Sequence, residues 1–173
     1  MKFSILILIL FSSYSAIANN SNANINKGNL EAGGSAFLGY SRFSKFDIGI
    51  APEIQYFVAD NISFGGEVSG EFNTSSSSVG GGPKVAFYFW SSEKWVADVA
   101  LSVFFSRSSV AGLVVSGFTN YLDILPSASL LYFVLPTVAV GPTLRVDVPV
   151  NRRMYDGTTD ISAVLFAKLS VYF

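Results

Sequence analysis

Residues 161–173 read ISAVLFAKLSVYF, and every second side chain from Ile161 to Phe173 is apolar. The intervening set contains Ser162, Lys168 and Ser170. An apolar set with a period of two is typical of a β-strand that has one face against an apolar environment. The stretch therefore predicts a strand, and the same period indicates the structure of the rest of the chain.

The alternation recurs along the sequence and predicts eight strands. Their approximate spans are 29–40, 46–58, 62–73, 79–90, 95–107, 119–133, 137–149 and 161–173. Each span has the nine or more residues that a tilted transmembrane strand needs, whereas no apolar run reaches the ~18 residues of a transmembrane helix. Half of the residues are hydrophobic, only 13% are charged, and the mean hydropathy is +0.46. This composition favours a membrane protein that crosses the bilayer with strands.

The charged residues decide which face of each strand points outward. Eleven of those inside the eight spans lie on the less apolar phase, and Arg107 at a strand end is the exception. A soluble ligand-carrying barrel has apolar residues inside and charges outside, which is the opposite arrangement. The sequence therefore predicts an all-β fold: an eight-stranded, antiparallel, up-and-down transmembrane β-barrel with a polar lumen and a lipid-facing apolar exterior.

The first residues have the pattern of an export signal. Lys2 supplies a positive charge, residues 3–11 form a short apolar run, and Ala16-Ile17-Ala18 offers small residues for cleavage. We therefore expect a cleaved signal peptide over 1–18, a short flexible lead-in over 19–28, and a single barrel domain over 29–173.

Short and long connections alternate along the chain. Residues 59–61, 91–94 and 135–136 form short turns, with aromatic residues on the outward phase beside them, as in the interfacial girdle of membrane barrels. The connections at the other end are longer and rich in Ser, Thr, Arg and Asp. We expect the short turns on the periplasmic side and the longer loops outside the cell. Four prolines interrupt predicted strands and should cause local bulges or missing ladder bonds, namely Pro52, Pro83, Pro126 and Pro142.

Inward-pointing charges are the candidate functional residues. They form a predicted lumenal charge network of Glu53, Glu67, Lys84, Asp98, Asp123, Arg145, Asp147 and Lys168. Counted from the short turns, Glu53, Glu67, Lys84 and Lys168 share one level, and Asp123, Arg145 and Asp147 a higher one. A salt-bridge core that fills the narrow lumen is the favoured interpretation, and a carboxylate active site is the alternative.

The absence of two residue types limits the chemistry. The chain has no Cys and no His, which excludes thiolate and imidazole nucleophiles, bases and metal ligands. Basic and acidic residues are nearly balanced, 11 against 12, and no basic cluster suggests a nucleic-acid partner. We therefore expect no cofactor, no metal and no enzymatic activity.

The final strand carries the most specific resemblance. With Leu169, Val171 and the terminal Phe173 at alternating positions, the chain resembles the small eight-stranded outer-membrane barrels of the OmpX and OmpA-barrel type. This resemblance implies a monomer in the outer membrane of a Gram-negative bacterium, in contact with lipid. It also implies that the barrel-assembly machinery reads these three residues as an assembly signal.

Two functions follow as expectations. The first is a non-enzymatic role in envelope structure or surface interaction through extracellular loops, and the alternative is a narrow, cation-favouring pore. The connection 108–118 is unusually apolar for a loop, with Val110, Leu113, Val115 and Phe118 as candidate partner contacts. Either the flanking strands simply extend into it, or the protruding hairpin also binds a surface partner.

Overall fold

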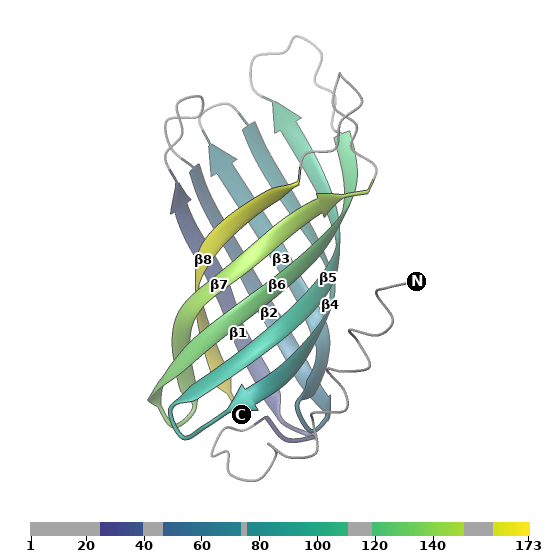
Figure 1. The fold of residues 1–173 in the computed structure, drawn as a ribbon. Helices are drawn as coiled ribbons and strands as arrows, with labels where there is room; N and C mark the ends of the chain where they lie inside the picture. The colour runs from purple at the N-terminus through teal and green to yellow at the C-terminus, as the bar shows by residue number, and fades with distance from the viewer. Residues whose placement is uncertain (1–24, 40–46, 74–75, 111–118, 151–160) are drawn as a thin grey trace.

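Eight antiparallel strands form a closed barrel. The computed structural model describes residues 25–39, 47–73, 76–110, 119–150 and 161–173 (Figure 1). Each strand pairs with its neighbours in sequence, and the last strand closes the barrel against the first. This confirms the predicted fold. The strands are β1 (Leu30–Gly39), β2 (Asp47–Ala59), β3 (Ile62–Asn73), β4 (Ser76–Ser91), β5 (Trp95–Val110), β6 (Thr119–Leu135), β7 (Val138–Pro149) and β8 (Ser162–Tyr172).

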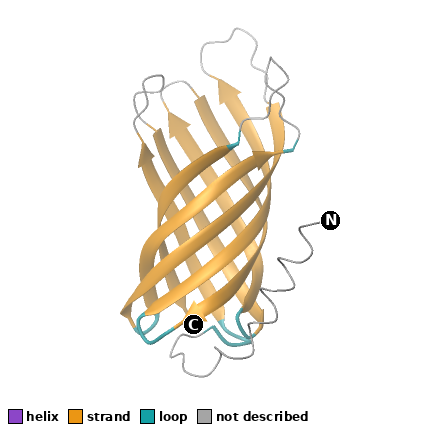
Figure 2. Cartoon of the chain, viewed as in Figure 1, coloured by secondary structure: helices purple, strands orange, loops and turns teal. Residues whose placement is uncertain are grey.

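The two ends of the barrel differ in their connections. Short turns join β2 to β3, β4 to β5 and β6 to β7 at one end, where the C-terminus also lies (Figure 2). We call this the turn end, and the opposite end the loop end. The predicted strands agree with the observed ones to within three residues, the largest differences being an earlier start of β4 and a later end of β5. None of the described residues forms a helix that is long and apolar enough to cross a membrane.

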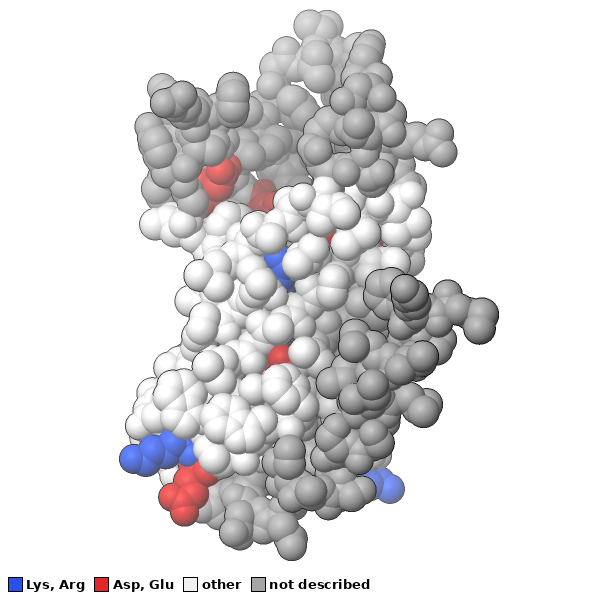
Figure 3. All heavy atoms as spheres, in the orientation of Figure 1, with Lys and Arg blue, Asp and Glu red and all other residues white. Residues whose placement is uncertain are grey.

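Burial follows the predicted alternation. In β2 nearly every second residue is buried, from Gly49 to Phe57, and the residues between them are exposed. The exposed set is apolar, because Ile50, Ile54 and Tyr56 each leave 48–55% of their surface uncovered. In the space-filling view the described middle of the barrel is almost entirely uncharged on this face (Figure 3). An uncharged belt around a polar interior is the arrangement of a transmembrane barrel.

The four strand prolines interrupt one ladder each and leave the register unchanged. Pro52 pairs with Gly34 of β1, but the β2–β3 pairing skips from Ile50 to Glu53. Equivalent gaps occur at the other three prolines, in the β4–β5 ladder and twice in the β6–β7 ladder. Because proline has no N–H, it keeps a partner on one side only. Missing ladder pairs at the prolines are therefore confirmed, but the expected bulges are absent there.

The register shifts instead lie at the turn end. They occur between Phe57 and Ala59, between Tyr88 and Trp90, and between Phe133 and Leu135, just before the three short turns. An extra residue in one strand of a pair sharpens the local twist. Phe57, Tyr88 and Phe133 continue the inward alternation of their strands up to these bulges, and they lie inside the lumen at the turn end.

Candidate functional site

A buried ion-pair network crosses the lumen. The Lys84 Nζ lies 2.5 Å from Glu53 Oε2 and 3.4 Å from Glu67 Oε2. Lys168 approaches the other oxygen of Glu53, with Nζ 2.7 Å from Oε1. Two lysines from β4 and β8 thus share one carboxylate from β2.

The network extends to the remaining walls of the barrel. Lys168 Nζ also lies 3.2 Å from Glu31 Oε1 and 4.0 Å from Asp98 Oδ2. On the other side, an Arg145 guanidinium nitrogen lies 3.3 Å from Glu67 Oε2. The β6 residue Ser129 donates a hydrogen bond to Asp98 Oδ1 at 3.2 Å. All eight strands therefore contribute a side chain to one connected set of contacts, which we call the lumenal network.

Neutral side chains add hydrogen bonds to two of the carboxylates, Glu31 and Asp98. Glu31 accepts hydrogen bonds from the Tyr88 hydroxyl and from Ser170 Oγ, the latter at 2.6 Å. Thr143 Oγ1 donates to Ser129 Oγ at 3.0 Å and so supports the contact with Asp98. Buried charges are tolerated when they are both paired and hydrogen-bonded. Glu31 and Glu53 meet both conditions. Lys168 Nζ and Asp98 Oδ2 are ion-paired but form no hydrogen bond within the described part of the chain.

Burial of this set is nearly complete. None of its ion-paired side chains exposes more than 10% of its surface. An eight-stranded barrel has an interior only wide enough for side chains. The network therefore occupies the middle of the lumen and cross-links its walls.

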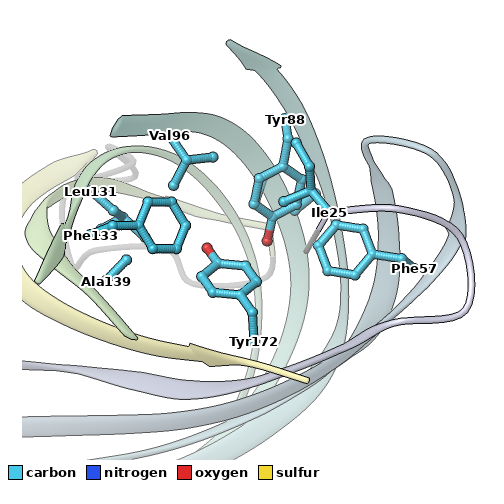
Figure 4. Close-up of a cluster of buried hydrophobic side chains, with 10 residues drawn as sticks. Ile25, Phe57, Tyr88, Val96, Leu131, Phe133, Ala139 and Tyr172 are labelled. Atoms are coloured by element: carbon cyan, nitrogen blue, oxygen red, sulfur yellow. The ribbon is translucent and has the colours of Figure 1, made fainter. Parts of the chain in front are cut away.

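The turn end of the lumen is closed by an apolar cluster. Phe57, Tyr88, Leu131, Phe133 and Tyr172 lie together here, and the hydroxyls of both tyrosines point into the barrel (Figure 4). The ring centroids of Phe57 and Tyr88 are 5.1 Å apart, and those of Phe133 and Tyr172 5.5 Å. The Tyr88 hydroxyl joins this cluster to the lumenal network through Glu31.

Ile25 completes the cluster from outside the barrel domain. Its side chain is only 1% exposed, and its carbonyl accepts a hydrogen bond from Asn61 N at 2.9 Å. Gly28 N donates to Phe57 O, and Lys27 N to Asp60 Oδ1, both at 2.9 Å. The segment before β1 is therefore held against the β2–β3 turn. Nothing in the sequence around Ile25 indicates this contact, because a single isoleucine among polar residues has no periodicity.

Aromatic rings lie above the network, toward the loop end. The Arg145 guanidinium carbon lies 4.8 Å from the centroid of the Phe166 ring, which meets the Phe37 ring edge-on at 5.0 Å. A guanidinium over an aromatic face gains electrostatic attraction from the ring. Arg145 is therefore held by Glu67 on the turn side and by Phe166 on the loop side.

Most of the predicted network residues meet one another. Glu53, Glu67, Lys84, Asp98, Arg145 and Lys168 are joined in the lumenal network. The prediction of a separate higher layer is wrong for Arg145, because its long side chain reaches Glu67. Asp123 is buried and Asp147 half-buried on the same inward phase. Glu31 was absent from the predicted network, although the alternation in its strand places it inward.

The other predicted sites lie on the barrel wall and beyond it. Leu169 and Val171 of β8, and Phe173 after it, lie on the outward phase. Phe173 N donates to Leu30 O at 2.8 Å, and Leu30 N donates to Phe173 O at 3.1 Å, which closes the barrel at the turn end. Val110 is the last residue of β5, whereas Leu113, Val115 and Phe118 lie outside the described residues. Within the described ranges, no group of three or more carboxylates is placed to hold a metal ion.

Comparison with solved structures identifies the architecture. The N-terminal β-barrel domain of Pseudomonas aeruginosa OprF superposes with a TM-score of 0.65 at 11% identity, covering 85% of this chain and 98% of that one. The chain has the fold of the small outer-membrane β-barrels. Neisserial surface protein A gives a TM-score of 0.60 at 15% identity, covering 84% of this chain and 95% of that one.

A third small outer-membrane barrel agrees with the first two. Ail, the attachment invasion locus protein of Yersinia pestis, gives a TM-score of 0.54 at 10% identity, covering 85% of this chain and 99% of that one. The resemblance to this fold that was predicted from the C-terminal strand is confirmed. No model of a protein family matches the sequence, and no curated protein matches it either.

Proposed function

We propose that this chain is an integral outer-membrane protein without enzymatic activity, which supports envelope structure or surface contact and does not conduct ions. The observation that carries the proposal is the filled lumen. The lumenal network occupies the middle of the lumen, and the apolar cluster that includes Ile25 closes its turn end. A barrel whose interior is occupied in this way offers rigidity and a platform for its loops.

Membrane insertion is supported by the outer surface. Large apolar side chains such as Phe64, Phe105 and Leu165 leave 56–65% of their surface uncovered around the described barrel. An exposed apolar belt of this size is unfavourable in water and is favourable in contact with lipid. The predicted signal peptide over 1–18 would deliver the chain to the periplasm. Contact of the C-terminal strand with the barrel-assembly machinery remains part of this proposal.

The network also argues against catalysis. Glu53, Glu67 and Glu31 each contact at least one cationic side chain in the lumen. A carboxylate that acts as a general acid or base must instead reach a substrate proton. The lumenal carboxylates are better suited to holding the walls together.

A narrow pore is the second candidate. Eight acidic residues lie on the inward phase against three basic ones, and this excess would favour cations. Within the lumenal network, however, four carboxylates face three cations, so most of that charge is balanced. The other four acids, Asp47, Glu71, Asp123 and Asp147, lie on the loop side of it.

Single-channel recording separates the two candidates. We expect the refolded protein to produce no resolved conductance steps in planar lipid bilayers in potassium chloride. Incorporation is checked in parallel by circular dichroism of the same preparation in vesicles. Stable unitary steps from a folded sample would overturn the proposal of a closed lumen and favour the pore.

A further inference from the structure

The first and last strands separate toward the loop end. Pairing between β1 and β8 runs from Glu31 with Tyr172 to Ala36 with Ala167. Beyond that point, Phe37–Gly39 pair only with β2, and residues 162–166 only with β7. On the lumen side, the edge-on contact between Phe37 and Phe166 spans the gap. The wall is therefore split at its seam, and aromatic rings back the split from inside.

An apolar groove follows this seam on the outer face. It has a volume of about 940 Å³ and is lined by residues of β1, β2, β7 and β8. Its outward-facing floor consists of the small residues Gly34, Ala36 and Ala167, with Ile50 and Pro142 beside them. Elsewhere most outward positions carry Leu, Ile, Val or aromatic side chains, with exceptions such as Gly66, Gly70 and Ala128. The groove forms where small side chains lie at the last β1–β8 pairs, next to the point at which the two strands separate.

The position of the groove determines what fills it. Leu38, Leu165 and Leu169 line it and are 49–70% exposed, so it is continuous with the apolar belt that contacts lipid. Sites for small ligands usually have volumes of about 300–1,000 Å³ and mainly apolar linings. A hydrocarbon chain is flexible enough to follow this groove and matches its apolar lining.

We propose that the groove between β1 and β8 binds one acyl chain of a membrane lipid and holds it longer than the lipid around the rest of the barrel. The proposal rests on the proposed membrane insertion and adds a specific site to it. The bound chain covers the split seam from the lipid side, as Phe37 and Phe166 cover it from the lumen.

A photo-cross-linking map tests the proposal on the unmodified chain. The full chain is inserted into phosphatidylcholine vesicles that contain a trace of phosphatidylcholine with a diazirine in its acyl chain. After irradiation, peptides are mapped by mass spectrometry. We expect the adducts to concentrate on groove residues of β1 and β8 rather than on a matched patch centred on β6, where Ala128 lies between Val99 and Leu144. Equal labelling of the two faces would overturn the proposal.

Retention of lipid provides a second test. We expect one lipid to remain bound to the chain after extraction from phosphatidylcholine vesicles into mild detergent, as measured by native mass spectrometry. The double variant Ala36→Leu and Ala167→Leu fills the floor of the groove and should lose this lipid. The control Ala128→Leu makes one such substitution on the outer face of β6 and should retain the lipid. Equal retention by all three proteins would contradict a specific site.

Two further outcomes are distinguishable. A wild-type dimer that the double variant abolishes and Ala128→Leu keeps would assign the groove to a second copy of the chain and overturn the lipid proposal. Failure of the wild-type chain to insert into vesicles would overturn the proposed membrane function itself, whereas insertion with uniform labelling would overturn only the groove. If the double variant does not fold, the map on the unmodified chain decides.

Discussion

At the scale of single residues, Lys168 contacts more carboxylates than any other cation in the part of the chain that the structure describes. Its Nζ lies within 4.0 Å of carboxylates from three strands, on Glu31, Glu53 and Asp98. Lys84 contacts two carboxylates, and each of these keeps a second cation, namely Lys168 for Glu53 and Arg145 for Glu67. The alternation in sequence places both lysines inside the barrel but cannot rank them, because the ranking depends on which carboxylates lie across the lumen.

We predict that Lys168→Met destabilises the folded barrel more than Lys84→Met does. Removing one partner of a buried ion pair typically costs about 3–5 kcal/mol. The full cost applies to Lys168, since Glu31 loses the one lysine in contact with it among the described residues, whereas the partners of Lys84 remain paired. Urea unfolding in vesicles measures both variants. Lys94→Met, at an exposed turn position, is the control and should change stability by less than about 0.5 kcal/mol. A larger effect for Lys84→Met would contradict the observed pairing.

Asn61 carries the left-handed backbone of the β2–β3 turn. Its φ angle is +63°, a region that asparagine and glycine adopt far more readily than other residues. Asn61→Ala should therefore destabilise the barrel by about 1–2 kcal/mol, while Asn61→Gly should have little effect. The same urea titration tests this pair. Equal stability of the alanine and glycine variants would show that the turn relaxes into another conformation.

At the scale of elements, the strands could be predicted because their two faces meet different environments. The period of two and the inward charges define every strand to within three residues of its observed bounds. The bulges beside the turns, the anchoring of Ile25 and the split above Ala36 and Ala167 could not be predicted. These features depend on which residues face each other across the barrel, and a pattern along one strand contains no such information.

We predict that deletion of Phe173 reduces the amount of assembled barrel without affecting export. The residue makes two backbone hydrogen bonds with Leu30 at the closing seam, where β1 and β8 share only six registered pairs. Quantification of the chain in outer-membrane and periplasmic fractions measures assembly. Phe173→Leu is the control, because it keeps both backbone hydrogen bonds and removes only the aromatic ring. If this variant also fails to assemble, the aromatic ring itself is recognised. Normal assembly of the deletion variant would contradict both the role of these backbone bonds in closing the barrel and the role of Phe173 as an assembly signal.

The connection after β5 supports a separate prediction about surface contact. Leu113 and Val115 follow the end of β5 at Val110, and both lie outside the described residues. If this apolar segment binds a partner, Leu113→Ser with Val115→Ser should reduce adhesion of expressing cells to surfaces or host material. Barrel assembly, measured in the same cells, should remain normal. Unchanged adhesion in every assay would leave the segment as an extension of the hairpin.

At the scale of the whole molecule, closure distinguishes the barrel from an open sheet. The ladder runs through all eight strands and returns from β8 to β1, so unfolding must break a complete set of pairs at some seam. The lumenal network then adds contacts between walls that are not neighbours, such as Lys168 of β8 with Asp98 of β5. The seam between β1 and β8 has the fewest pairs, and opening should begin there.

We therefore expect the protein to migrate differently in SDS gels before and after boiling. Detergent coats the apolar belt without breaking the inter-strand hydrogen bonds, so the unheated chain remains compact. Heating opens the seam, and the chain then binds more detergent and runs at its full length. The transition temperature should be lower for Lys168→Met than for wild type, because this variant weakens the contact between β8 and the opposite wall. Identical migration of heated and unheated wild-type protein extracted from outer membranes would contradict a closed barrel.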